Sequence, residues 1–196
     1  MSQFYSPIVH NLTPYVPGEQ PQNRQYLKLN TNENPYPPSA QVAQALADHD
    51  IDLLKRYPDP DASELLNAIA QQYQLSPEQV FVGNGSDEVL AHAFHAFFTE
   101  KAPILYPDIT YIFYPVYAQL YKIQSQLVHV NSDFKLNPSD FNQICGGVIL
   151  PNPNAPTGRY LALSHIESIV KSQPKQVVII DEAYIDFGGE SAVSLI

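Results

Sequence analysis

The chain has 196 residues, enough for one large domain or for one and a fraction, and a hydrophobic content of 44% that can supply a buried core. Its net charge of −10, without a cluster of Lys or Arg, argues against a nucleic-acid groove or an anionic membrane surface. The single cysteine, Cys145, excludes an intramolecular disulfide framework and a cysteine-based zinc site, and we expect it to be buried.

The first 38 residues are rich in Pro and Asn and show no helical periodicity. They predict an extended arm with one short strand around Leu27–Leu29, which must lie on another part of the protein to be ordered. Residues 39–75 then carry helix signals. Ser39 precedes one helical segment, Asp61 and Glu64 resemble a capping box for the next, and Ser76-Pro77 begins a short turn.

From Val80 onward, apolar strands alternate with helices. Strands are predicted at 80–83, 102–106, 125–130, 146–152 and 176–181, and helices at 86–98, 111–121 and 164–172, the last with a capping box of Ser164 and Glu167. This alternation predicts an α/β fold, a three-layer α/β/α arrangement in which helices cover both faces of a mostly parallel sheet.

Two acidic residues directly follow the last predicted strand. Its β-branched run Val177–Ile180 predicts a strand buried on both faces, and Asp181 and Glu182 follow directly. Open α/β sheets bind ligands at the carboxyl ends of their strands, so Asp181 is a candidate ligand-binding residue. The alternative is a strand that simply ends in solvent.

A glycine-rich turn lies between the strand at 80–83 and the helix that follows. Bare backbone at a helix N-terminus suits a phosphate, and the alternative is an ordinary turn with Ser86 as the N-cap. The dinucleotide fingerprint fails because Glu88 stands at its third glycine position, which argues against a nicotinamide-binding module. No Gly-Lys-Ser/Thr follows, so the turn is not a P-loop either.

Three further sequence features are weaker indications of a binding site. The proline-rich segment 150–161 predicts a rigid loop and permits a cis X-Pro bond. The tyrosines of 111–121 suit helix packing, although a ring at the start of that helix could stack on a flat ligand. His92 and His95 have the i, i+3 spacing of metal ligands but no third ligand nearby, which favours structural histidines.

Together and in this order, these motifs resemble fold type I pyridoxal-phosphate aminotransferases, and within them the histidinol-phosphate aminotransferase family. The resemblance rests on NLTPYVPGEQP and LNTNENPYPPS in the arm, RYPDPDASELLNAIA, VFVGNGSDEVL, NPNAPTG and DEAYIDF. It implies an extended arm at 1–38, a helical segment at 39–75 that completes the small-domain and interface region, and part of the cofactor-binding large domain at 76–196.

The resemblance also implies residue roles. Asp181 would contact the protonated pyridine nitrogen of the cofactor and Tyr184 its phenolic oxygen, while Tyr111 would stack on the ring. The cofactor phosphate would lie on Gly85, Ser86 and Asp87. The substrate-binding assignments are Tyr15 in the arm and Tyr57, which would reach the neighbouring active site of a homodimer.

The sequence departs from the family pattern at two points that bear on these residue roles. The Asn that usually precedes Pro-Thr-Gly is replaced by Ala155, so either Asn154 takes its place through a shifted loop or Tyr184 makes the contact alone. The Schiff-base lysine of the family is expected beyond Ile196, and the seven lysines of the chain all precede Asp181. We therefore expect the 196-residue chain alone to be inactive and to expose an apolar sheet edge.

The activity implied for the parent protein is transamination between L-histidinol phosphate and 2-oxoglutarate, giving imidazole-acetol phosphate and L-glutamate. An aromatic-amino-acid aminotransferase, a phosphothreonine decarboxylase of the same fold and a non-catalytic truncated chain remain alternatives. Since the sequence has no signal peptide and no apolar run long enough to span a bilayer, we expect a cytoplasmic protein without membrane or nucleic-acid partners.

Overall fold

A computed structural model describes residues 3–10, 12, 18–19 and 27–196 of the chain. The α-helices are α1 (Ala40–Ala47), α2 (Ser63–Tyr73), α3 (Ser86–Phe97), α4 (Phe113–Leu120) and α5 (Leu163–Ser172). The strands are β1 (Ile104–Pro107), β2 (Ser125–Val128), β3 (Gly147–Pro151) and β4 (Val178–Asp181). Short 3-10 helices are η1 (Ile51–Lys55), η2 (Pro77–Gln79), η3 (Pro138–Phe141), η4 (Ile185–Phe187) and η5 (Ala192–Leu195).

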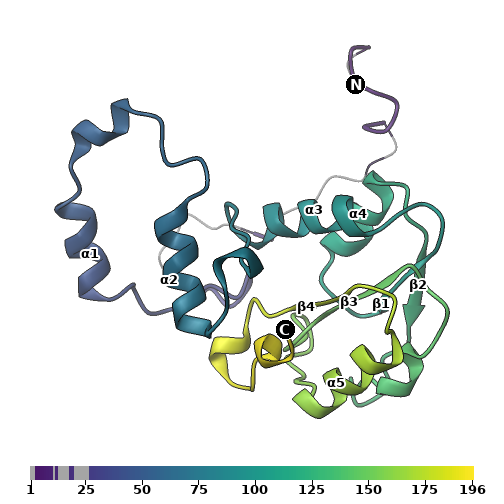
Figure 1. Ribbon diagram of the computed structural model, residues 1–196. Helices are drawn as coiled ribbons and strands as arrows, with labels where there is room; N and C mark the ends of the chain where they lie inside the picture. Colours follow the sequence, from purple (N-terminus) through teal and green to yellow (C-terminus); the bar gives the residue numbers. More distant parts are fainter. Residues whose placement is uncertain (1–2, 11, 13–17, 20–26) are drawn as a thin grey trace.

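The four strands form one parallel sheet in the order β2-β1-β3-β4 (Figure 1). In its register, Pro151 at the end of β3 lies opposite Asp181 at the end of β4. The carboxyl ends of the strands therefore meet at one edge of the sheet. The predicted α/β class and parallel sheet are confirmed.

Alternating side chains of the strands enter two separate cores, one on each face of the sheet. On one face, Ile104, Tyr106 and Ile149 pack with apolar residues of α3 and α4. On the other, Leu105 and Leu150 pack with residues of α5 and η3. Helices thus cover both faces, as the alternation of strands and helices predicted, and Figure 1 shows α3 and α4 on the side of the sheet away from α5.

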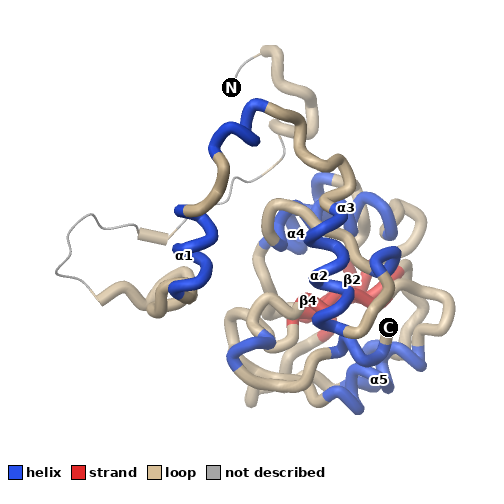
Figure 2. Tube along the Cα trace, turned by 60° about the vertical axis from the view of Figure 1, so that its left-hand side comes forward, coloured by secondary structure: helices blue, strands red, loops and turns tan. Residues whose placement is uncertain are grey.

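The segment that precedes the sheet is built differently. The described residues of 1–38 contain no helix or strand, so the strand expected at Leu27–Leu29 is wrong. Residues 39–75 contain the expected helices, joined by loops. Of these, α1 and η1 bury no side chain and extend away from the sheet in both views (Figures 1 and 2). Without a packing partner among the described residues, the apolar face of α1 is exposed to solvent.

Two strand predictions need correction. Residues 80–83 are extended but form no strand, because no described strand pairs with them. Strand β4 is half-buried rather than buried on both faces. It stands at the end of the strand order and pairs only with β3, which leaves its outer edge open.

The helices lie where they are predicted, but the residues at their N-termini differ from the predicted caps. Asp59, not Asp61, caps the start of α2 by accepting the N–H of Ser63 at 2.7 Å. Helix α5 begins at Leu163 after Ala162, without a side-chain cap, so the capping box of Ser164 and Glu167 is wrong. The short turn expected at Ser76-Pro77 is confirmed as η2, with Ser76 as its N-cap.

Three side chains singled out in the sequence, Cys145, His92 and His95, have defined surroundings in the structure. Cys145 is buried, as expected. The ring of His92 packs edge-on against Phe81 and that of His95 stacks on Tyr121. No group of three His, Cys, Asp or Glu side chains in the described residues could hold a metal ion, and none of their helices is long and apolar enough to cross a bilayer.

Candidate active site

The N-terminus of α3 presents bare backbone. Gly85 is its N-cap, so the expectation of Ser86 as the N-cap is wrong by one residue. With φ at 83° and ψ at 171°, Gly85 adopts a conformation open in practice only to glycine, and a Cβ added there would meet no atom within 4 Å. No side chain caps the helix. The first N–H groups of α3 therefore have no capping side chain, and the helix dipole favours an anion beside them.

The two acidic residues at the end of β4 have different partners. Asp181 accepts the hydroxyl of Tyr114 on Oδ2 at 2.7 Å and the N–H of Ala183 on Oδ1 at 3.2 Å. Glu182 instead accepts the N–H of Ala192 at 2.7 Å, which fastens the chain after η4. Only Asp181 lines a cavity at the carboxyl edge of the sheet, so it is the acid available to a ligand there.

A small cavity of about 70 Å³ lies at this edge. Its lining comes from segments far apart in the sequence: Ser86, Tyr111, Pro151, Ala155, Asp181, Ala183 and Tyr184. Four residues that the sequence predicted as cofactor contacts, Ser86, Tyr111, Asp181 and Tyr184, are therefore brought together. The cavity combines a helix N-terminus, a carboxylate and two phenol rings.

Two tyrosine hydroxyls, from Tyr111 just before α4 and from Tyr117 within it, contact the start of α3. Tyr111 donates to Oδ1 of Asp87 at 2.7 Å, and Tyr117 donates to the backbone carbonyl of Asp87 at 2.9 Å. Burial, together with the charge of Asp87, raises the pKa of Tyr111 well above its usual value and that of Tyr117 to about 12. Both hydroxyls stay protonated and donate, which holds Asp87 and the glycine turn against α4.

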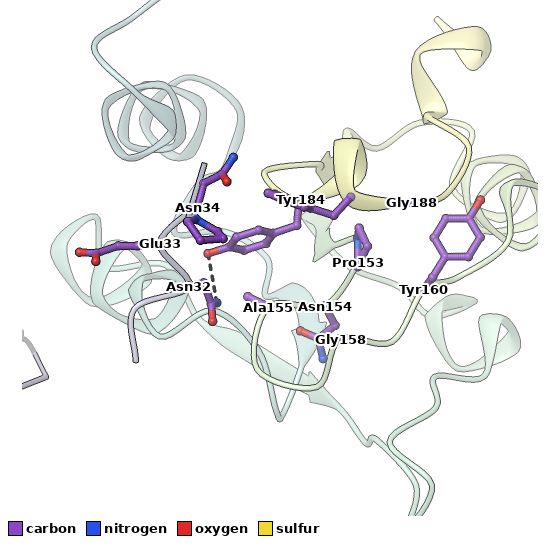
Figure 3. Close-up of a pocket in the computed structure, with 12 residues that line it drawn as sticks. Asn32, Glu33, Asn34, Pro153, Asn154, Ala155, Gly158, Tyr160, Tyr184 and Gly188 are labelled. Atoms are coloured by element: carbon purple, nitrogen blue, oxygen red, sulfur yellow. Dashed lines mark hydrogen bonds between the residues drawn. The ribbon is translucent and has the colours of Figure 1, made fainter. Parts of the chain in front are cut away.

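A larger pocket of about 430 Å³ adjoins the cavity and shares Ala155 and Tyr184 with it (Figure 3). The arm forms one side through residues 32–35. Asn32 donates its amide to the hydroxyl of Tyr184 at 3.3 Å, as the dashed line in Figure 3 shows. The described end of the arm therefore contacts this site directly.

The proline-rich loop closes the other side of the pocket. It contains a cis bond between Asn152 and Pro153, and the buried Asn152 side chain pairs with both backbone groups of Leu161. Asn154 is 3% exposed and donates its amide to the carbonyl of Ile109 at 2.9 Å, while its Oδ1 has no partner in the described part of the chain. Ala155, not Asn154, lines the inner cavity.

The other predicted site residues lie further out. Gly85 and Asp87 flank Ser86 but do not line the cavity. Tyr57 is fully exposed on the segment that extends from the sheet, so no described residue covers it. Tyr15 lies outside the described residues.

Sequence reasoning missed two contacts. The tyrosine pattern of 111–121 indicates helix packing for Tyr114 and does not announce its hydrogen bond to Asp181, although the spacing of three between Tyr114 and Tyr117 places both rings on one side of α4. The contact between Asn32 and Tyr184 joins residues 152 apart in sequence, and no local pattern announces it.

Comparison with known proteins places these features in a family. The family described as "Aminotransferase class I and II" matches residues 24–196. The chain is 57% identical over 196 residues to histidinol-phosphate aminotransferase 1 of Hydrogenovibrio crunogenus, with 100% of this chain and 55% of the relative covered. It is 58% identical over 198 residues to histidinol-phosphate aminotransferase of Acinetobacter baylyi, with 99% and 55% covered.

A solved structure shares the fold. The histidinol-phosphate aminotransferase of Sinorhizobium meliloti, in complex with pyridoxal-5'-phosphate, matches with a TM-score of 0.80 at 18% identity, over 98% of this chain and 54% of that one. The chain thus spans about 55% of the length of the curated relatives it matches.

Proposed function

Since the chain belongs to the aminotransferase class I and II family, we propose that the whole protein is a pyridoxal-phosphate-dependent histidinol-phosphate aminotransferase. It would exchange an amino group between L-histidinol phosphate and 2-oxoglutarate, giving imidazole-acetol phosphate and L-glutamate. The names of relatives that are 57% and 58% identical support this substrate. The observation that carries the proposal is the meeting of Ser86, Tyr111, Asp181 and Tyr184 around one cavity.

The described residues fit pyridoxal phosphate chemically. A phosphate needs N–H donors, and the N-terminus of α3, which has no capping side chain, supplies them. A protonated pyridine nitrogen needs an anion, and the carboxylate of Asp181 lines the cavity. A ring oxygen needs a hydrogen-bond donor, which the hydroxyl of Tyr184 provides. When bound, the cofactor would supply an electron sink for the bond that breaks at the substrate Cα.

Each residue would then have a defined task. Asp181 would accept the N–H of the pyridinium and keep that nitrogen protonated. Ser86, with the backbone after Gly85, would hold the phosphate. Tyr111 is fastened through Asp87 and would present its ring to the cofactor, which fixes the plane of the bound group.

The contact to the ring oxygen is assigned to Tyr184 alone. The amide of Asn154 is engaged by the carbonyl of Ile109, and Ala155 occupies the adjoining wall of the cavity. This supports the second of the two alternatives raised by the sequence. None of the seven lysines of the chain lines this cavity, so a covalent anchor for the cofactor would come from outside these 196 residues.

The larger assembly is also proposed from the family. The arm at 1–38, the interface segment at 39–75 and the partial cofactor domain at 76–196 would belong to a cytoplasmic homodimer. The exposed ring of Tyr57 and the unburied side chains of α1 support a partner on that segment. In such a dimer Tyr57 and Tyr15 would contact the substrate.

The test is a steady-state comparison of kcat/KM on the whole protein for histidinol phosphate, phenylalanine and phosphothreonine. The proposal predicts that histidinol phosphate is used best, with release of imidazole-acetol phosphate. A dominant rate with phenylalanine would reassign the protein to aromatic amino acids. Release of carbon dioxide from phosphothreonine would identify a decarboxylase instead.

A further inference from the structure

The carboxylate of Asp181 is held from both sides. Its Oδ1 accepts the N–H of Ala183 at 3.2 Å, and its Oδ2 accepts the hydroxyl of Tyr114 at 2.7 Å. The first donor belongs to the turn that follows β4, whereas the second comes from α4. A carboxylate with one donor on each oxygen cannot rotate without breaking a hydrogen bond. The plane of the Asp181 carboxylate is therefore fixed by the structure around it.

Tyr114 is itself immobile. Its side chain is fully buried in the core that α3, α4 and the sheet share. Phe94 packs against its ring at 6.1 Å, and Tyr106 and Tyr111 meet it edge-on at 6.1 and 5.7 Å. The hydroxyl is thus aimed at Asp181 by a packed core, not by a flexible loop.

The hydroxyl also stays a donor at every working pH. Burial, with the charge of Asp181 beside it, raises the pKa of Tyr114 far above its usual value. The neighbouring tyrosines Tyr111 and Tyr117 do not share this task, because both donate to Asp87. Among the hydrogen bonds of the described residues, Tyr114 makes the one side-chain contact to the Asp181 carboxylate.

We propose that Tyr114 is a positioning residue that orients the carboxylate of Asp181 toward the pyridine nitrogen of the bound cofactor. This rests on the proposed function, because it takes the cavity to be the pyridoxal-phosphate site. Tyr114 does not line the cavity and acts only through Asp181. Its loss should weaken recognition of the ring nitrogen and leave recognition of the phosphate and the ring oxygen unchanged.

The experiment compares two ligands on the whole protein, freed of its cofactor: pyridoxal phosphate and its 1-deaza analogue, in which carbon replaces the ring nitrogen. Dissociation constants are measured by absorbance titration for the wild type and for Tyr114→Phe, which removes only the hydroxyl. We expect Tyr114→Phe to bind pyridoxal phosphate about tenfold more weakly, the scale of one hydrogen bond to a charged group. Its affinity for the deaza analogue should match that of the wild type.

Tyr106→Phe is the matched control. Tyr106 lies in the same core at 4% exposure and donates its hydroxyl to Ser125 at 2.8 Å, away from the cavity. Its substitution removes a buried tyrosine hydroxyl of the same kind without touching Asp181. Both dissociation constants should therefore stay within twofold of wild type. If Tyr114→Phe does not fold, Tyr114→Met fills much of the same space without a hydroxyl and takes its place.

The outcomes separate this inference from the function on which it rests. Equal losses of both ligands in Tyr114→Phe, or no loss of either, would overturn the positioning role. Failure of the proposed function has another signature, since the wild type would then bind neither ligand or would not distinguish the ring nitrogen from carbon. A selective loss of pyridoxal phosphate in Tyr114→Phe alone supports the inference.

Discussion

Asp181 and Asp87 each take the hydroxyl of a tyrosine from the α4 region, and this pairing gives the site its shape. The sequence pointed to Asp181 because it follows a predicted strand, and the family resemblance pointed to Asp87. It could not name their partners. Tyr114 is 67 residues from Asp181, and only the crossing of α4 over the sheet brings them together.

A third acidic residue, Asp108, also accepts hydrogen bonds from a segment distant in sequence, but it lies outside the candidate site. Asp108, directly after β1, accepts the ring N–H of His129 at 2.8 Å and the backbone N–H of Val130 at 2.9 Å. Burial alone would raise the pKa of Asp108, but these hydrogen bonds outweigh it and the pKa lies below its ordinary value. A depressed carboxyl pKa stabilises the fold above about pH 4 and loses that contribution as the pH falls through the folded-state value.

We therefore predict that Asp108→Asn lowers the free energy of unfolding at pH 7 by about 1 kcal/mol, the typical value of such a hydrogen bond. The difference from wild type should shrink as the pH falls from about 4 through the lowered folded-state pKa of Asp108, because protonation of the carboxyl removes its favourable pairing. Urea unfolding at several pH values measures this. Asp133→Asn, at an exposed position, is the control and should have little effect. A loss that is the same at pH 3 and pH 7 would show that charge plays no part.

At the scale of elements, periodicity predicted most of the structure correctly. The helices α2 to α5 and the four strands formed where apolar patterns placed them. The two strand predictions that are wrong depend on which strands lie side by side in the sheet, and not on the strand propensity of the segment itself. Residues 80–83 have strand composition but lack a pairing partner among the described strands, and β4 is half-buried because only β3 flanks it. The residues at two helix starts also differ from those expected: Asp59 takes the place of Asp61, and Gly85 takes the place of Ser86.

The N-terminus of α3 allows a sharp test at this scale. Gly85→Ala would force a side chain into a backbone conformation that costs roughly 1–3 kcal/mol, although there is open space for the Cβ itself. We expect lower stability in urea unfolding together with weaker pyridoxal phosphate binding, because relief of the strain moves the N–H groups of the turn. Ser86→Ala, one residue on, should keep the stability within about 0.5 kcal/mol of wild type. Wild-type stability in Gly85→Ala would mean that the turn does not depend on glycine.

At the scale of the whole molecule, one edge of the described sheet is open to solvent. The outer edge of β4 is unpaired in the described structure, and an apolar hollow of about 300 Å³ lies beside it, between α5 and η5. Open strand edges next to apolar surface promote association. The sequence predicted this edge from the resemblance alone, and the strand order supplies the structural reason.

We predict that the isolated 196-residue chain associates in solution through this edge. Val177→Lys, at a position 36% exposed just before β4, should reduce the apparent mass in light scattering, because a lysine on an edge strand opposes pairing. Leu127→Lys places the same charge on β2 at the opposite end of the sheet and should change little. A monodisperse monomer for the unaltered chain would show that its core is already closed.

The central claim is that the cavity at the end of β4 binds pyridoxal phosphate through Asp181. Absorbance titration of the whole protein with pyridoxal phosphate tests it most directly, with Asp181→Ala compared against Asp186→Ala, an exposed acid five residues further along the chain. Loss of a buried charge pair predicts at least about thirtyfold weaker binding for Asp181→Ala, while Asp186→Ala should match the wild type. If the folded Asp181→Ala protein, checked by circular dichroism, binds the cofactor as tightly as wild type, the claim is contradicted.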